Sequence, residues 1–167
     1  MRFCSIKAMR IIFIFLGLQL LSACSETQHP TCPVPLAKEV ARSAGCFAVQ
    51  NGRLLVVEGL AGTINPPGGS SMTGESAQCA AHRETWEETG LDLQVNELLQ
   101  VMDTGFYLYR CSFHANSGEI DPPRRLEIKR AFMLHPNDFD KYQWRFPEQT
   151  KQLQALVRAH QDARPQK

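Results

Sequence analysis

Two apolar runs separated by Asn51-Gly52 give the clearest structural signal in this chain. The runs cover 44–50 (AGCFAVQ) and 53–60 (RLLVVEGL). Asn-Gly between two apolar runs favours a type I′ turn, in which both central residues have positive φ. The sequence therefore predicts a β-hairpin, and the Gly-, Pro- and Ser-rich residues 60–75 predict a loop after it.

The rest of the chain alternates helical and extended patterns. A helix is predicted over 77–89, with Ser76 as its N-cap and Gly90 as its C-cap. Further strands are predicted over 91–102, 106–114 and 126–134. Pro147 opens a last helix, in which an apolar stripe is expected to pack on the core: Leu153, Leu156 and Val157. This order of elements indicates an α/β fold.

Three glutamates share one face of the predicted helix 77–89. Glu84, Glu87 and Glu88 are three and four positions apart, and no Lys or Arg follows at the i+4 positions. Like charges at this spacing destabilise a helix, whereas a hard divalent cation such as Mg²⁺ or Mn²⁺ binds carboxylate oxygens well. Taken alone, the glutamates fit a solvated helix end better than a metal site.

The flanking residues reverse that preference. Pro67-Gly68-Gly69 predicts a tight turn in which backbone groups approach a ligand closely. Arg83 follows Glu75 by eight residues and precedes Glu88 by five, a position from which it can orient both carboxylates. The combined pattern favours a metal site.

The segment 69–91 (GSSMTGESAQCAAHRETWEETGL) resembles the Nudix box, Gx5Ex7REUxEExGU, where U is a bulky aliphatic residue. The matching positions are Gly69, Glu75, Arg83, Glu84, Glu87, Glu88, Gly90 and Leu91. The one departure is Thr85, which is expected to pack inward. A looser resemblance over 43–160 implies the Nudix-type α/β/α sandwich with a mixed β-sheet.

This resemblance implies metal-dependent hydrolysis of a diphosphate bond in a nucleoside diphosphate linked to another moiety. It implies that Mg²⁺ or Mn²⁺ is held by Glu84, Glu87 and Glu88, helped by the carbonyl of Gly68 or Gly69. Glu75 and Arg83 would orient these carboxylates. The alternative is a Nudix fold that binds a nucleotide or docks an envelope protein without turnover.

The general base varies across the family, and the candidates in this chain are Glu84 and Glu127. Glu127 precedes Phe132 by five residues, a spacing that resembles the late glutamate of many Nudix domains. It is predicted to be a further metal ligand or the base, or else a strand glutamate that faces solvent. The catalytic candidates are thus Glu84, Glu87 and Glu127.

Residues 1–23 predict a signal peptide. Three basic residues precede an apolar run at 11–21, which is too short to span a membrane. Leu21-Ser22-Ala23-Cys24 resembles a bacterial lipobox, so Cys24 is the predicted lipidated N-terminus, unless the signal is an ordinary secretory one or an uncleaved anchor. Ser25 in place of Asp favours the outer membrane, facing the periplasm, by analogy with lipoprotein sorting.

Composition and length are ordinary for one exported domain. The chain has 167 residues and a net charge of +1, which gives no argument for binding nucleic acid. The Pro-rich residues 24–37 are predicted to be a tether between the lipid and a Nudix domain at 38–167. The small-molecule substrate is expected to bind the domain, and the lipid to hold it at the membrane.

Apart from Cys4 and Cys24, four cysteines remain, which permits two disulfides in an oxidising compartment: Cys32, Cys46, Cys79 and Cys111. Cys-X2-Cys spacing is absent, so a zinc site is not expected. Cys46 and Cys111 fall in strands that would be neighbours in a Nudix sheet, and this pair is the predicted bridge. Cys79 is left as either paired or free.

Three other groups of side chains have two interpretations each. The basic cluster is predicted to be a solvated loop edge rather than a phosphate site: Arg124, Arg125, Lys129 and Arg130. The aromatic residues Phe139, Tyr142 and Trp144 are expected to pack rather than stack on a base. His82 is predicted to face solvent.

Overall fold

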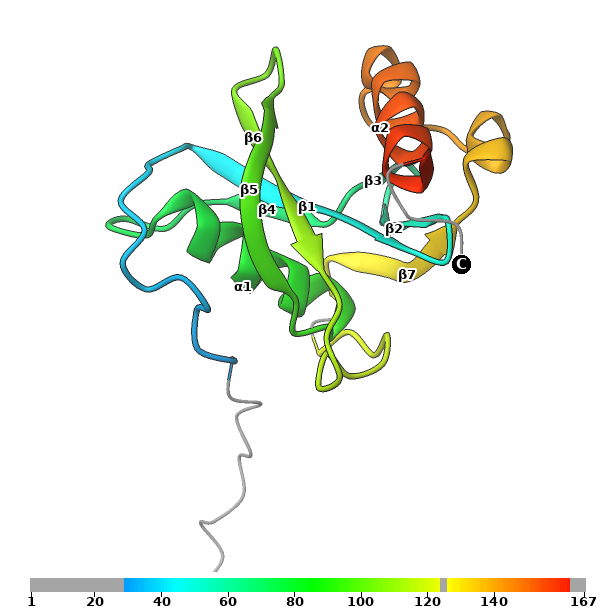
Figure 1. Cartoon of the computed structure of the whole chain (residues 1–167). Coiled ribbons are helices and arrows are strands. Elements are labelled where there is room, and N and C mark those ends of the chain that lie inside the picture. The colour runs from blue at the N-terminus through cyan, green and yellow to red at the C-terminus, as the bar shows by residue number, and fades with distance from the viewer. Residues whose placement is uncertain (1–28, 124–125, 163–167) are drawn as a thin grey trace, which may run out of the picture.

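The computed structural model describes residues 29–123 and 126–162 of the chain (Figure 1). Strands β1 (Ser43–Gln50) and β2 (Arg53–Gly59) form the predicted hairpin. Asn51 and Gly52 between them have φ values of 51° and 71°, as a type I′ turn requires. The predicted signal peptide and Cys24 lie outside the described residues. Among the described residues, 29–123 and 126–162, the structure contains no helix of the length and apolar character needed to cross a membrane.

The other predicted elements are present, with shorter strands than expected. The 60–75 segment contains β3 (Ile64–Asn65) and β4 (Gly68–Ser70), which the sequence pattern did not predict. Helix α1 spans Ala77–Thr89 as predicted, and β5 (Gln94–Val101) and β6 (Phe106–Ser112) follow it. The last described elements are β7 (Ile128–Leu134), two 3₁₀ turns at Pro136–Lys141 and Pro147–Gln149, and α2 (Thr150–Asp162).

The strands form a mixed sheet with one parallel pair. The main order is β3-β2-β1-β6-β5, while β4 pairs with the start of β1 and β7 pairs with β2. Strands β1 and β6 are parallel, and the other pairs are antiparallel. Because β4 is hydrogen-bonded to the first three residues of β1, the Gly-rich segment is held beside the centre of the sheet.

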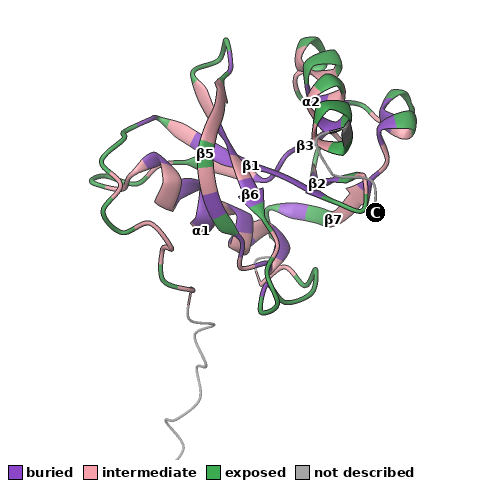
Figure 2. Ribbon diagram, in the orientation of Figure 1, coloured by how far each residue is buried: buried purple, intermediate pink, exposed green. Residues whose placement is uncertain are grey.

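Both faces of the central strands are buried, which explains why β1 reads as a continuous apolar run (Figure 2). Cys46 and Ala48 pack in one core cluster with alanines of α1. Phe47 and Val49 pack in a second cluster with residues of α2. Since successive residues of a strand point to opposite faces, the two helices cover opposite faces, and the predicted α/β/α sandwich is confirmed.

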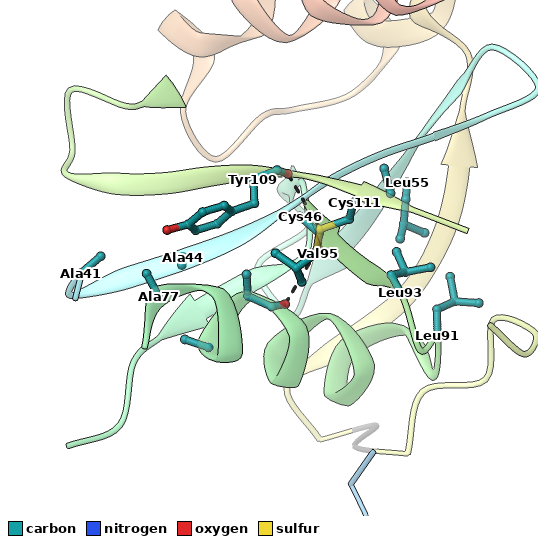
Figure 3. Close-up of a cluster of buried hydrophobic side chains, with 13 residues drawn as sticks. Ala41, Ala44, Cys46, Leu55, Ala77, Leu91, Leu93, Val95, Tyr109 and Cys111 are labelled. Atoms are coloured by element: carbon teal, nitrogen blue, oxygen red, sulfur yellow. Dashed lines mark hydrogen bonds between the residues drawn. A yellow bond between two sulfur atoms is a disulfide. The ribbon is translucent and has the colours of Figure 1, made fainter. Parts of the chain in front are cut away.

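Two disulfides link the described residues. Cys46 and Cys111 are bonded across the parallel β1–β6 pair with Cα atoms 5.4 Å apart, inside the α1-side core (Figure 3). This pairing was predicted. The other bond joins Cys32 to Cys79 on α1, with Cα atoms 5.3 Å apart, and thus fastens part of the predicted tether to the domain. The domain boundary at residues 37 and 38 stays a prediction.

The prediction for His82 was wrong. Its side chain is fully buried, and Nε2 lies 2.8 Å from Oδ1 of Asp92. Helix α1 buries mostly small and polar residues around His82, so the sequence shows no large apolar side chains that would mark this face as the buried one. Thr85 is buried as predicted. The aromatic residues pack as expected: Trp144 donates from Nε1 to the Phe139 carbonyl at 3.0 Å, and their rings are in contact.

Candidate active site

Helix α1 presents the glutamates to β4 because both of its ends are fixed. The Ser76 hydroxyl accepts a hydrogen bond from the Cys79 N–H at 3.3 Å, which caps the N-terminus. Gly90 adopts φ 78° and donates to the Trp86 carbonyl at 2.7 Å. A Cβ at Gly90 would also clash with the backbone of Asp121, so only glycine fits at this end of α1.

Arg83 joins the acidic residues into one network. Its Nε and Nη2 each lie 2.9 Å from an oxygen of Glu75, a bidentate pair. Nη1 lies 2.8 Å from Glu84 and 3.4 Å from Glu87, and Nη2 also donates to the Ser70 carbonyl at 2.8 Å. The guanidinium therefore ties two α1 glutamates to the 70–75 loop. The expected contact with Glu75 is present, whereas Glu88 accepts a hydrogen bond from the Gly68 N–H instead.

The Gly-rich strand β4 lies directly against two of the glutamates. A Cβ at Gly69 would sit 2.5 Å from Cδ of Glu84, closer than real Cβ contacts allow. The Gly68 N–H donates to Oε2 of Glu88 at 2.8 Å. A side chain at position 69 would therefore have to displace the Glu84 carboxylate, a close approach that the sequence pattern did not reveal.

Burial makes ionisation of Glu84 and Glu88 unfavourable in the metal-free protein. Burial raises the pKa of Glu88 to about 8, repulsion from Glu84 and Glu127 adds to the effect, and the Gly68 N–H opposes it. Burial likewise raises the pKa of Glu84, partly offset by Arg83. Glu75 differs, because hydrogen bonds from Arg83 and the Met72 N–H outweigh its burial and hold its pKa below the usual value.

The donor set matches the chemistry of a hard cation, although its side chains are not gathered around one point. All three α1 glutamates offer oxygen ligands, and positive charge would relieve the cost of ionising Glu84 and Glu88. Among the described residues, however, no three His, Cys, Asp or Glu side chains are placed to hold one ion, and Arg83 bridges Glu84 and Glu87 instead. The residues fit the cation by their chemistry, while their side chains do not converge on one point in this arrangement.

Glu127 lies at the edge of this cluster. It is exposed and sits in a turn just before β7, rather than inside the predicted strand. Its charge nevertheless raises the pKa values of both Glu84 and Glu88. Lys129 and Arg130 point to a different partner, since both form ion pairs with Glu58 on β2. Arg124 and Arg125 of the predicted basic cluster lie outside the described residues.

A pocket of about 280 Å³ opens beside Gly68 and Gly69, and sequence reasoning missed its other lining residues. They include Asn65, Phe106, Arg145 and Phe146. Arg145 reaches this place because its N–H donates to the Ile64 carbonyl at 3.0 Å, a contact between residues 81 positions apart in the sequence. The positive charge of Arg145 opposes the rise in the pKa of Glu88, so Arg145 lies within electrostatic reach of that carboxylate. No local sequence signal marks such a contact.

Similarity to known proteins agrees with this geometry. The NUDIX domain model matches residues 40–164. No protein with a curated description matches the chain in sequence. The chain is similar in fold to a UDP-X diphosphatase, with a TM-score of 0.60, 20% identity, and 79% of this chain and 69% of that chain covered.

Two other solved structures show the same fold. An ADP-ribose pyrophosphatase from Streptococcus suis gives a TM-score of 0.59 at 18% identity, covering 74% of this chain and 94% of that one. An Ap4A hydrolase from C. elegans gives a TM-score of 0.54 at 18% identity, covering 73% of this chain and 99% of that one. Because the family model matches residues 40–164, which are most of the chain, and the box folds as described, the chain belongs to the NUDIX domain family and is a Nudix hydrolase.

Proposed function

We propose that this protein hydrolyses a diphosphate bond in a nucleoside diphosphate linked to another moiety, with Mg²⁺ or Mn²⁺ as its cofactor. The observation that carries the proposal is the position of Glu84 and Glu88 on α1, which lie against Gly69 and Gly68 of β4, two residues that also line the 280 Å³ pocket. The polar and aromatic lining of that pocket suits a nucleoside or sugar. The diphosphate of such a substrate would then lie beside the glutamates.

Glu84, Glu87 and Glu88 would hold the metal, with the carbonyl of Gly68 or Gly69 as a further ligand. Bound there, the cation supplies charge neutralisation of the phosphate oxygens and lowers the pKa of an attacking water. Arg83 keeps Glu84 and Glu87 in place and is itself held by Glu75. Glu84 or Glu127 accepts the proton of the water, and the exposure of Glu127 supports its access to a bound substrate.

A substrate screen on the purified protein tests this proposal. Nucleotide sugars, ADP-ribose and dinucleoside polyphosphates are assayed for phosphate products with Mg²⁺, with Mn²⁺ and with a chelator. Metal-dependent turnover of at least one class is expected. If nucleotides bind without any turnover under all three conditions, the alternative of a non-catalytic binding module is correct.

We further propose that the enzyme acts at the cell envelope, anchored by lipid on Cys24 and facing the periplasm from the outer membrane. The two disulfides support an oxidising compartment. More than one acyl chain gives stable anchoring. Cys24→Ala should leave the precursor unprocessed or release the protein from the membrane fraction. Normal cleavage together with unchanged membrane association in this variant would contradict the proposal.

A further inference from the structure

A pair of histidines lies on the side of α1 that the hydrolytic site does not use. The N-terminal described segment, blue in Figure 1, runs beside α1 and is bonded to it through Cys32 and Cys79. Three residues before Cys32, the ring of His29 packs edge-on against His82, with centroids 5.6 Å apart and planes at 80°. His29 also contacts Trp86, at 5.0 Å between centroids.

Hydrogen bonds define which ring nitrogen carries the proton in each histidine. His29 Nδ1 lies 2.6 Å from the Pro30 carbonyl, and because a carbonyl only accepts, Nδ1 is the protonated nitrogen. His82 Nε2 lies 2.8 Å from the Asp92 carboxylate, so Nε2 carries the proton there. In the neutral rings, the remaining nitrogens, His29 Nε2 and His82 Nδ1, are therefore lone-pair donors to any ligand.

Both of these nitrogens are buried and have no hydrogen-bond partner among the described residues. Buried polar atoms normally have a partner, because an unsatisfied one costs stability. Two lone pairs cannot satisfy each other. A ligand that accepts electron pairs from both rings would satisfy them together, and a metal cation with a preference for imidazole is such a ligand.

We propose that His29 and His82 bind a borderline divalent cation, of which Zn²⁺ is the representative. Asp92 supports this assignment, since metal-binding histidines commonly donate their other N–H to a carboxylate that fixes the ring. No third His, Cys, Asp or Glu of the described chain joins the pair, so the remaining ligands would have to be water molecules that enter with the ion. The bound ion adds a second cross-link between the N-terminal segment and α1, beside the Cys32–Cys79 bond.

Calorimetric titration of the full-length protein with Zn²⁺ tests the site. Millimolar Mg²⁺ is included because it competes for the oxygen ligands of the glutamate cluster and leaves imidazole pairs to Zn²⁺. His29→Gln should weaken Zn²⁺ binding by at least about tenfold, whereas His114→Gln, the matched control, should leave it unchanged. Equal Zn²⁺ affinity in wild type and His29→Gln, or no Zn²⁺ binding by wild type, would overturn the proposal.

Asp92→Ala provides a second variant that keeps both ligands. It should lower Zn²⁺ affinity by about tenfold or more, because the His82 ring loses the group that orients it. A merely structural Asp92 would alter the thermal midpoint and leave Zn²⁺ affinity unchanged, which counts against the site. Mg²⁺-dependent diphosphate hydrolysis by His29→Gln is expected to match wild type, so failure of the zinc site and failure of the proposed function remain distinguishable.

Discussion

The two helices of the sandwich have the same length of 13 residues but are held in opposite ways. Helix α2 is fastened by apolar side chains, with Leu153 and Val157 fully buried against the sheet. Helix α1 buries small alanines together with His82, Thr85, Glu87 and Thr89. Polar and charged residues are rarely buried unless something specific compensates them.

That difference separates a helix that stabilises the fold from one that carries chemistry. On α1, Arg83 and the Gly68 N–H supply the compensation for the glutamates, yet burial still leaves Glu84 and Glu88 with raised pKa values. Burying these carboxylates therefore costs α1 folding free energy, a cost that the apolar buried face of α2 does not have. Substitutions on the two helices should accordingly separate activity from stability.

Glu87→Gln should give the largest effect. The amide keeps the volume of the side chain and removes a charge that the proposed metal needs, so hydrolysis should fall by at least about a thousandfold, roughly 4 kcal/mol of barrier. The thermal midpoint without metal should change little, because relief of like-charge repulsion on the helix face is offset by weakening of the 3.4 Å contact with Arg83. Steady-state rates and thermal melts with a chelator measure both quantities.

Leu153→Ala should show the reverse behaviour on α2. A fully buried leucine replaced by alanine costs about 2–5 kcal/mol of unfolding free energy, which denaturant titration measures. Turnover at a temperature where the variant is folded should stay within about threefold of wild type, because Leu153 lies in the α2-side core and is neither one of the α1 glutamates nor a lining residue of the pocket. A thousandfold loss of turnover in this folded variant would remove the distinction between the helices.

Arg83→Ala should reduce hydrolysis less than Glu87→Gln does, by about 10–100-fold, because it acts through the orientation of the metal-binding carboxylates. Comparison with Arg83→Lys separates charge from geometry. Lysine keeps the charge but cannot reproduce the bidentate pair with Glu75. Activity equal to wild type in both variants would show that the network has no orienting role.

The pH dependence of stability gives a smaller effect. Without metal, Glu88 stays protonated in the folded protein up to a pKa of about 8, whereas in the unfolded chain it ionises near the ordinary glutamate pKa of 4.5. The folded state thus binds more protons between these values, and its stability falls as pH rises through this interval. Thermal melts with a chelator should show that fall, and Glu88→Gln should flatten it. An unchanged slope in the variant would contradict the assignment to Glu88.

Local signals in the sequence predicted the hairpin and both ends of α1, because Asn51-Gly52, Ser76 and Gly90 act through their own backbone geometry. The Nudix resemblance gave the Cys46–Cys111 bridge, since it supplied the strand order. Features made by distant segments were not predicted. The Cys32–Cys79 bond depends on the path of the N-terminal segment, and the place of Arg145 depends on backbone pairing with Ile64.

Within α1, the error at His82 has a similar origin. The inward face of this helix is made of Ala77, Ala80, Ala81 and Thr85, whose small side chains leave no strong apolar periodicity. Sequence spacing found the glutamates correctly on one helix. It gave no information about Arg83 bridging Glu84 and Glu87, or about the depth at which Glu88 is buried.

The most direct test of the account is Mn²⁺ binding, followed by electron paramagnetic resonance of the free ion. Wild type and Leu153→Ala should bind Mn²⁺ with equal affinity, while Glu87→Gln and Glu88→Gln should each bind it at least about tenfold more weakly, since each loses a ligand charge. Wild-type affinity in both glutamate variants would contradict the claim that α1 holds the catalytic metal.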